Sequence, residues 1–90
     1  MLPECWKRYT VKLPGDYTIS AAIINHPSNP ETRWHCALGA LVINPNITTD
    51  RELPLKANEP LTLRYRVIAQ DGAFDANRMN ELVCDHVTTR

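Results

Sequence analysis

The residue types most suited to binding a ligand lie between positions 26 and 35 of this 90-residue chain. Two prolines stiffen its first part, His26–Thr32, and exclude a regular helix or strand ladder there. Its candidate ligand-binding residues are His26, Asn29, Arg33, Trp34 and His35. An indole can stack on the C–H groups of a sugar ring while polar side chains bind its hydroxyls. The segment indicates a platform for a carbohydrate-like ligand; the alternative makes Trp34 a core anchor and His26 a loop brace.

Catalysis has less support from the residues, because no short motif brings together the groups that it needs. A nucleophile needs an adjacent base, and Ser28 beside His26 is better explained as a loop hydrogen bond. The acidic residues lie in predicted turns, which does not favour a pair of carboxylates facing each other across a cleft. We therefore assign no catalytic residue. The alternative is a sugar isomerase or hydrolase that uses His26 or His35 as acid or base near neutral pH.

Three His and three Cys do not form a metal-binding pattern. His35 and Cys36 are neighbours on a predicted strand, so their side chains point to opposite faces. Only His26 and His35, at the two ends of one loop, meet easily, and two ligands make a weak site. The sequence also contains no glycine-rich phosphate-binding motif. We expect neither a metal nor another cofactor.

Charge and composition exclude several classes of partner. Ten basic and ten acidic residues give a formal net charge of zero, and no basic cluster for nucleic acid is present. The apolar stretches are far shorter than the roughly 20 residues that cross a bilayer, so no membrane association is expected. The chain shows no signal-like start and its odd number of cysteines indicates reduced thiols, which favours the cytoplasm.

The elements that must position the candidate residues are mainly β-strands. Apolar and polar residues alternate over Leu61–Gln70, which predicts a half-buried strand ending at Asp71-Gly72. A nearly continuous apolar strand is predicted over Tyr17–Asn25. An earlier strand, from near Cys5 to Leu13, precedes it across a Pro-Gly-Asp turn.

Shorter elements complete the prediction. Leu53 and Leu55 indicate a short strand, and a further strand over Gly39–Ile43 is predicted to stop at Asn44-Pro45. Asp75 is suited to cap a helix, because apolar residues follow it at helical spacing. The apolar residues are Met79, Leu82 and Val83, and His86 continues the same spacing.

The expected fold class is mainly β, an antiparallel β-sandwich or partial sandwich with one short C-terminal helix. We expect residues 1–90 to form a single, partial β-sandwich domain. The apolar run within Tyr17–Asn25 requires cover on both faces, which one sheet of this size does not supply. We therefore expect self-association, or a partner chain that completes the sheet.

Several segments, in chain order, resemble the C-terminal part of the bacterial proteins labelled methane oxygenase PmoA-like. They are His26-Pro27-Ser28-Asn29-Pro30, Trp34-His35, Asn44-Pro45, Leu61–Val67, Asp71-Gly72 and the closing helix. The resemblance extends from Tyr17 to Val87 and implies a sandwich related to the galactose-mutarotase-like supersandwich, which is common among carbohydrate-processing proteins. Its members are longer, so several of their strands are missing here.

These observations lead to one functional expectation and two alternatives. We expect a non-catalytic, carbohydrate-associated binding module with a carbohydrate as its ligand. The first alternative is the sugar-processing enzyme described above. The second is a structural β subunit that a partner chain completes. A copper oxygenase is not expected, because the sequence has neither apolar spans nor a cluster of histidines.

Overall fold

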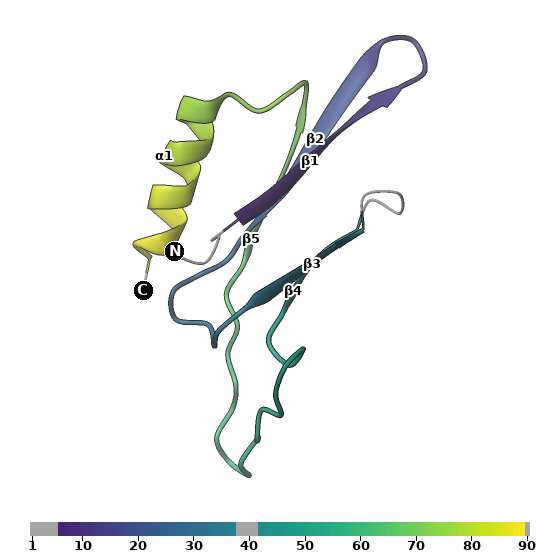
Figure 1. Ribbon diagram of the computed structural model, residues 1–90. Helices are drawn as coiled ribbons and strands as arrows, with labels where there is room; N and C mark the ends of the chain where they lie inside the picture. The colour runs from purple at the N-terminus through teal and green to yellow at the C-terminus, as the bar shows by residue number, and fades with distance from the viewer. Residues whose placement is uncertain (1–5, 38–41, 90) are drawn as a thin grey trace.

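The computed structural model describes residues 6–37 and 42–89, and this part of the chain is mainly β (Figure 1). The elements, in chain order, are β1 (Trp6–Leu13), β2 (Tyr17–Ile24), β3 (Arg33–Ala37), β4 (Val42–Asn46), β5 (Arg66–Asp71) and α1 (Ala76–Val87). All strand pairs are antiparallel. They form a three-stranded sheet with the order β1-β2-β5 and a separate sheet of β3 and β4. The predicted fold class is confirmed.

Strands β1 and β2 form a hairpin in which Leu13 lies opposite Tyr17. The turn between them contains Gly15 and Asp16, both with positive φ, at 85° and 61°. Glycine adopts such angles freely and Asp is one of the residues that tolerate them. The predicted turn is therefore confirmed. Strand β1 begins at Trp6, and the start predicted near Cys5 lies outside the described residues.

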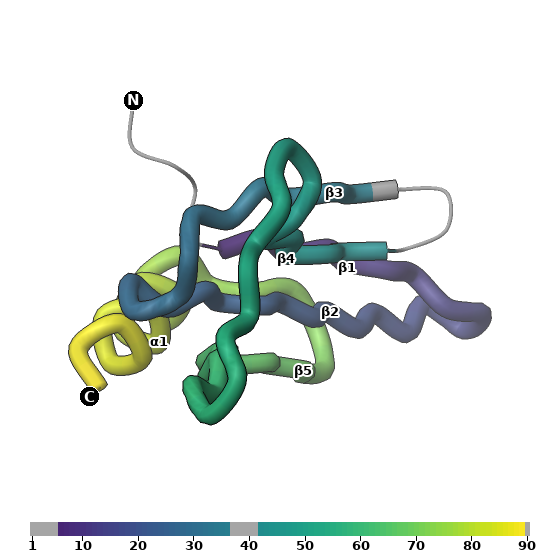
Figure 2. The backbone as a smooth tube through the Cα atoms, turned by 90° about the horizontal axis from the view of Figure 1, so that it is seen from below, coloured from purple at the N-terminus to yellow at the C-terminus, as the bar shows by residue number. Residues whose placement is uncertain are grey.

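Strand β2 is the central strand and is covered on both sides, as its composition predicts. Ser20, Ala22 and Ile24 are buried on the side of α1. The residues between them are half-buried on the other side, over which the β3–β4 hairpin lies (Figure 2). The fold is thus layered, with α1 on one face of the three-stranded sheet and the hairpin on the other.

The hydrophobic core lies between this sheet and α1. Its buried members are Ala22, Phe74 and Met79, with Trp6, Ile68, Leu82 and Val83 packed around them. The Asp75 side chain accepts a hydrogen bond from the Asn77 N–H and so caps the helix, as predicted. No helix in the described part of the chain has the length and apolar character needed to span a bilayer.

The strand predicted over Leu61–Gln70 is wrong in its first half, because β5 begins only at Arg66. Arg66 lies opposite Ile24, the last residue of β2. Beyond Ile24 the chain turns into the loop that contains His26 and Pro27, so residues 61–65 have no neighbouring strand to pair with. The end of β5 at Gly72, which has φ of 79°, agrees with the prediction.

Two further predictions need correction. Leu53 and Leu55 form no strand, and Leu55 is 70% exposed on a long excursion between β4 and β5. Strand β4 starts at Val42 and continues through Asn44 and Pro45 instead of stopping there; the predicted residues 39–41 lie outside the described part. Among described residues β4 pairs with β3 alone, and an edge strand tolerates a proline.

Candidate functional site

The structure does not gather the five predicted ligand-binding residues in one place. His26 and Asn29 belong to the loop that follows β2, whereas the other three residues lie on β3. Within β3, side chains alternate between the two faces. Arg33 and His35 are exposed on one face, and Trp34 is half-buried on the other.

His26 is buried and holds the loop to the C-terminal end of the described chain. Its Nδ1 lies 3.1 Å from the Ser28 backbone N–H, which donates to it, and 2.7 Å from Ser28 Oγ. Its Nε2 lies 2.8 Å from the carbonyl oxygen of Thr89, which can only accept. In these contacts Nδ1 acts as an acceptor and Nε2 as a donor. Both nitrogens are engaged, which is the loop-brace arrangement.

The residue that meets His26 is His86 and not His35, which was the partner the sequence favoured. The two ring centroids are 5.2 Å apart, with an edge-to-face angle of 75°. His86 is 5% exposed, and its Nε2 is buried with no hydrogen-bond partner among the described residues. Burial, with help from the Arg66 guanidinium, lowers the pKa of His86. In the sequence, only the helical spacing of His86 after Met79 and Val83 indicated that its side chain would be buried.

Asn29 fixes the chain upstream of β5. Its Oδ1 accepts from the Arg64 N–H at 2.8 Å, and its Nδ2 donates to the Arg64 carbonyl at 2.7 Å. The same Nδ2 group donates to Asn25 Oδ1 at 2.6 Å. One amide side chain thus makes the two backbone hydrogen bonds that a neighbouring strand residue would make. Its amide group is therefore already engaged with the backbone of Arg64 and with Asn25.

Arg33 lines a polar pocket of about 230 Å³ beside the hairpin. The Arg33 Nε is 3.0 Å from an Asp50 carboxylate oxygen, and its Nη2 is 3.8 Å from Glu31. On the other side of Glu31, Arg51 donates to its carboxylate at 3.3 Å and to its backbone carbonyl at 2.9 Å. The complete lining is Glu31, Arg33, Asn46, Ile47, Thr49, Asp50 and Arg51.

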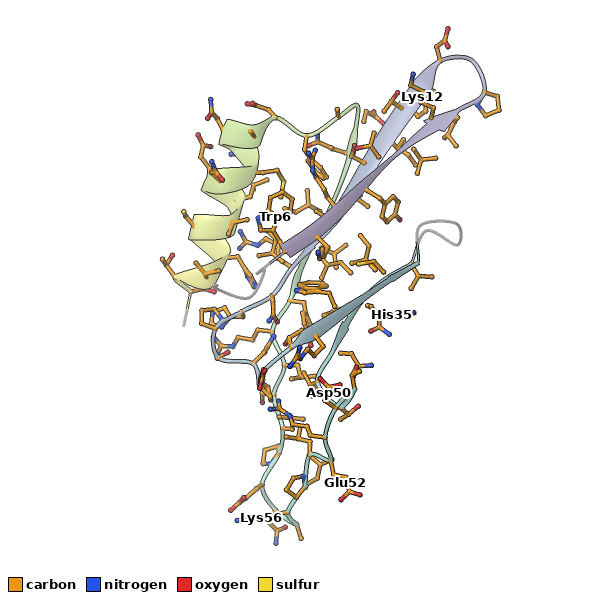
Figure 3. The ribbon with its side chains drawn as sticks, viewed as in Figure 1. Trp6, Lys12, His35, Asp50, Glu52 and Lys56 are labelled. Atoms are coloured by element: carbon orange, nitrogen blue, oxygen red, sulfur yellow. The ribbon has the colours of Figure 1, made fainter. Side chains whose placement is uncertain are left out.

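The pocket continues into a row of polar side chains on the outer face of the hairpin. In the β3–β4 register, Arg33 lies opposite Asn46 and His35 lies opposite Asn44. Paired residues share a face, so these four side chains lie together. Figure 3 shows the labelled His35 and Asp50 on the same side of the hairpin. We call this row, together with the pocket, the polar face.

The polar face contains residues that sequence reasoning missed. Glu31 and Asp50 were interpreted as solvated turn residues, and Arg51 was not considered. Position 31 comes close to positions 50 and 51 only through the pairing of β3 with β4. No local sequence pattern could therefore have connected them. Asn46 begins an Asx turn, in which its Oδ1 accepts from the Thr48 N–H at 2.8 Å, and this turn carries the chain back toward Glu31.

Two other hollows lie elsewhere on the described chain. One, of about 480 Å³, is open and is lined by His26, Ser28, Thr62, Arg64 and Thr89. The other, of about 280 Å³, is apolar and lies between the two sheets, where Ile23 and Val67 face Ile43. The described residues contain no group of three His, Cys, Asp or Glu side chains able to hold a metal ion.

Comparison with known proteins gives one match. Residues 3–84 match the family of unknown function DUF6807. No curated protein and no solved structure matches the chain. The family match does not connect the chain with PmoA-like or galactose-mutarotase-like proteins.

Proposed function

The chain belongs to the family of unknown function DUF6807, and we propose that it is a non-catalytic domain that binds a neutral saccharide at the polar face. The observation that carries this proposal is the pocket in which Arg33 and Arg51 alternate with Glu31 and Asp50. The relationship to PmoA-like proteins and to the galactose-mutarotase-like supersandwich is part of the same proposal.

The charge of the pocket favours a neutral ligand. Two guanidinium groups and two carboxylates balance, so the pocket has no excess charge that would select an anion or a cation. Side by side, these groups offer strong donors and strong acceptors. A sugar hydroxyl is both donor and acceptor, and adjacent hydroxyls match such a pattern. The pocket volume of about 230 Å³ suits one small ring.

The pairing of the charged groups also holds the pocket in shape before a ligand arrives. The guanidinium of Arg51 donates to both the carboxylate and the backbone carbonyl of Glu31. The guanidinium of Arg33 forms an ion pair with Asp50. The side chains of Arg33, Glu31 and Asp50 remain about 60% exposed, so their outer atoms are accessible to a ligand. Preformed polar groups lose less entropy on binding than mobile ones.

The geometry gives less support to the enzyme alternative. Both ring nitrogens of His26 already have partners, so this residue has no free nitrogen for proton exchange with a ligand. Glu31 and Asp50 both contact the guanidinium of Arg33, so these two carboxylates do not face each other across an open cleft. His35 is exposed at the rim of the polar face, where hydrogen bonding to a hydroxyl is its simplest role.

Titration of the full chain with a panel of neutral mono- and oligosaccharides, followed by amide chemical shifts, tests this proposal. We expect saturable shifts in the residues of the pocket. Arg33→Ala should weaken binding at least about tenfold, because a hydrogen bond from a charged donor is worth about 1.5–3 kcal/mol. Arg78→Ala is the matched control, since Arg78 forms a similar exposed ion pair with Glu81 on α1.

Either of two results would contradict the proposal. One is the absence of saturable shifts with every saccharide of the panel at millimolar concentration. The other is a binding constant that Arg33→Ala and Arg78→Ala change to the same extent. A saccharide that is chemically altered during the titration would instead favour the enzyme alternative.

A further inference from the structure

The segment 61–65 has the pattern of a β-strand, but no strand of the described chain pairs with it. Leu61, Leu63 and Tyr65 alternate with Thr62 and Arg64, and the chain runs from this segment directly into β5 (Figure 1). Leu61 is 42% exposed and Leu63 is 39% exposed. An alternating segment with exposed apolar residues and an open backbone edge is a template for strand pairing.

Two hydrogen bonds establish which edge of the segment is open. The Gly72 N–H donates to the Thr18 carbonyl at 2.7 Å, and the Arg64 N–H donates to Asn29 at 2.8 Å. Backbone groups of alternate residues point to the same edge of a strand. The even-numbered residues from 64 to 72 therefore face β2 and its loop, and the odd-numbered residues face outward.

On the outward edge, the backbone groups of Leu61, Leu63 and Tyr65 have no hydrogen-bond partner among the described residues. β5 is one of the two edge strands of its sheet, so the open edge continues along it (Figure 2). Asn29 satisfies the opposite edge only at Arg64. The segment is thus held in place on one side and unpaired on the other.

We propose that segment 61–65 pairs antiparallel with the same segment of a second copy of this chain, about a twofold axis through Leu63. In this register, Leu63 lies opposite Leu63 of the second copy, and Leu61 lies opposite its Tyr65. Apolar side chains then meet on one face of the ribbon. Thr62 lies opposite Arg64 of the second copy on the other face, so no like charges are opposed.

The neighbouring register is less favourable. A twofold axis through Tyr65 would place Arg64 directly opposite Arg66 of the second copy, and like charges in directly opposed positions destabilise a strand pair. Centring the pair on Leu63 avoids this contact. Pro60, which has no N–H, then lies at the end of the paired segment, where a proline is tolerated.

This interface is independent of the proposed saccharide site. The polar face lies on the β3–β4 hairpin and its following turn, and none of the five residues 61–65 lines its pocket. Failure of saccharide binding would therefore leave the pairing proposal intact, and failure of pairing would leave the saccharide proposal intact.

Sedimentation equilibrium of the full chain at increasing concentration tests the pairing. We expect a monomer–dimer equilibrium. Leu63→Pro removes an N–H that faces the second copy, and the twofold axis makes this a loss of two hydrogen bonds per dimer. The dimer dissociation constant should rise at least about tenfold. Thr62→Pro is the matched control, because its N–H faces the other edge, where the described residues provide no partner.

Three outcomes would overturn the proposal. The first is a full chain that stays monomeric at all concentrations. The second is an equal effect of Leu63→Pro and Thr62→Pro while far-UV circular dichroism shows both variants folded. The third is dimerisation that survives Leu63→Pro, which would place the contact on another surface, such as the apolar hollow between the sheets.

Disulfide trapping tests the register separately. Leu63→Cys, in a chain whose Cys5, Cys36 and Cys84 are replaced by Ser, should form a covalent dimer under mild oxidation, because opposed residues of an antiparallel pair lie within disulfide reach. Leu55→Cys is the control, since this exposed residue lies outside the segment. Equal trapping at both positions would contradict the proposed register.

Discussion

The rings of His26 and His86 meet edge to face, 5.2 Å apart, where the loop after β2 contacts the last turns of α1. His26 is fixed by Ser28 and by the Thr89 carbonyl. His86 contributes the facing ring from the helix. The contact therefore joins the end of the central strand to the end of the helix, and it places two titratable rings in the protein interior.

The first prediction concerns pH. The pKa of His86 lies below its usual value of 6.5, because burial, the Arg66 guanidinium and His26 disfavour its charged form; Asp85 and a hydrogen bond with the Ile24 backbone act in the opposite direction. As the pH falls below 6.5, the unfolded chain binds a proton that the folded chain does not bind. The stability contributed by neutral His86 is thus complete above that pH and declines on acidification.

Urea unfolding followed by circular dichroism, between about pH 7.5 and pH 5, measures this effect. The midpoint should fall with the pH, and the fall should be smaller in His86→Gln. His35→Gln, which replaces an exposed histidine, is the matched control. A wild-type midpoint that increases on acidification would show that the sign is wrong.

The second prediction concerns the Asn29 side chain. Asn29→Ala removes the acceptor for the Arg64 N–H and the donor to the Arg64 carbonyl. We expect faster amide exchange at Arg64 and a loss of about 1–3 kcal/mol in the free energy of unfolding. Asn44→Ala is the control, because Asn44 is an exposed residue of β4. Unchanged exchange at Arg64 would contradict the role of Asn29 as a substitute for a strand residue.

The third prediction concerns the core. Met79 is 2% exposed and packs with Ala22 and Phe74. Met79→Ala should reduce the free energy of unfolding by about 2–5 kcal/mol, through lost burial and the resulting cavity. Asn80→Ala, at the neighbouring exposed position, should change it little. If Met79→Ala does not fold, Met79→Leu should still fold, with a loss of free energy of unfolding under about 1.5 kcal/mol, because leucine nearly conserves the volume. A loss in Met79→Leu as large as about 2–5 kcal/mol would contradict an effect due to side-chain volume alone.

The sequence was informative where one local signal determines one element. The Pro-Gly-Asp turn, the Asp75 cap and Gly72 each lie where the structure uses them, because turn and capping geometry depend on a few adjacent residues. The two-sided apolar character of β2 correctly predicted cover on both of its faces, and α1 and the β3–β4 hairpin contribute this cover. These features require no knowledge of the rest of the chain.

The sequence was misleading where an element depends on its neighbour. Residues 61–65 have the alternation of a strand, but β2 ends opposite Arg66, so β2 does not extend the ladder to them. Pro45 was interpreted as a strand end, although an edge strand accommodates it. The pocket likewise depends on pairing, since only the β3–β4 register brings Glu31 close to Arg51.

The place of β2 between β1 and β5 also has a kinetic consequence. Only a short turn separates β2 from β1 in the sequence, where Leu13 pairs with Tyr17. A much longer segment separates β2 from β5, where Ile19 pairs with Asp71. Closing so long a loop has an entropic cost before any contact compensates for it, and contacts between distant residues slow folding. The first hairpin is thus positioned to form early, and β5 arrives last, bringing α1 with it to complete the core.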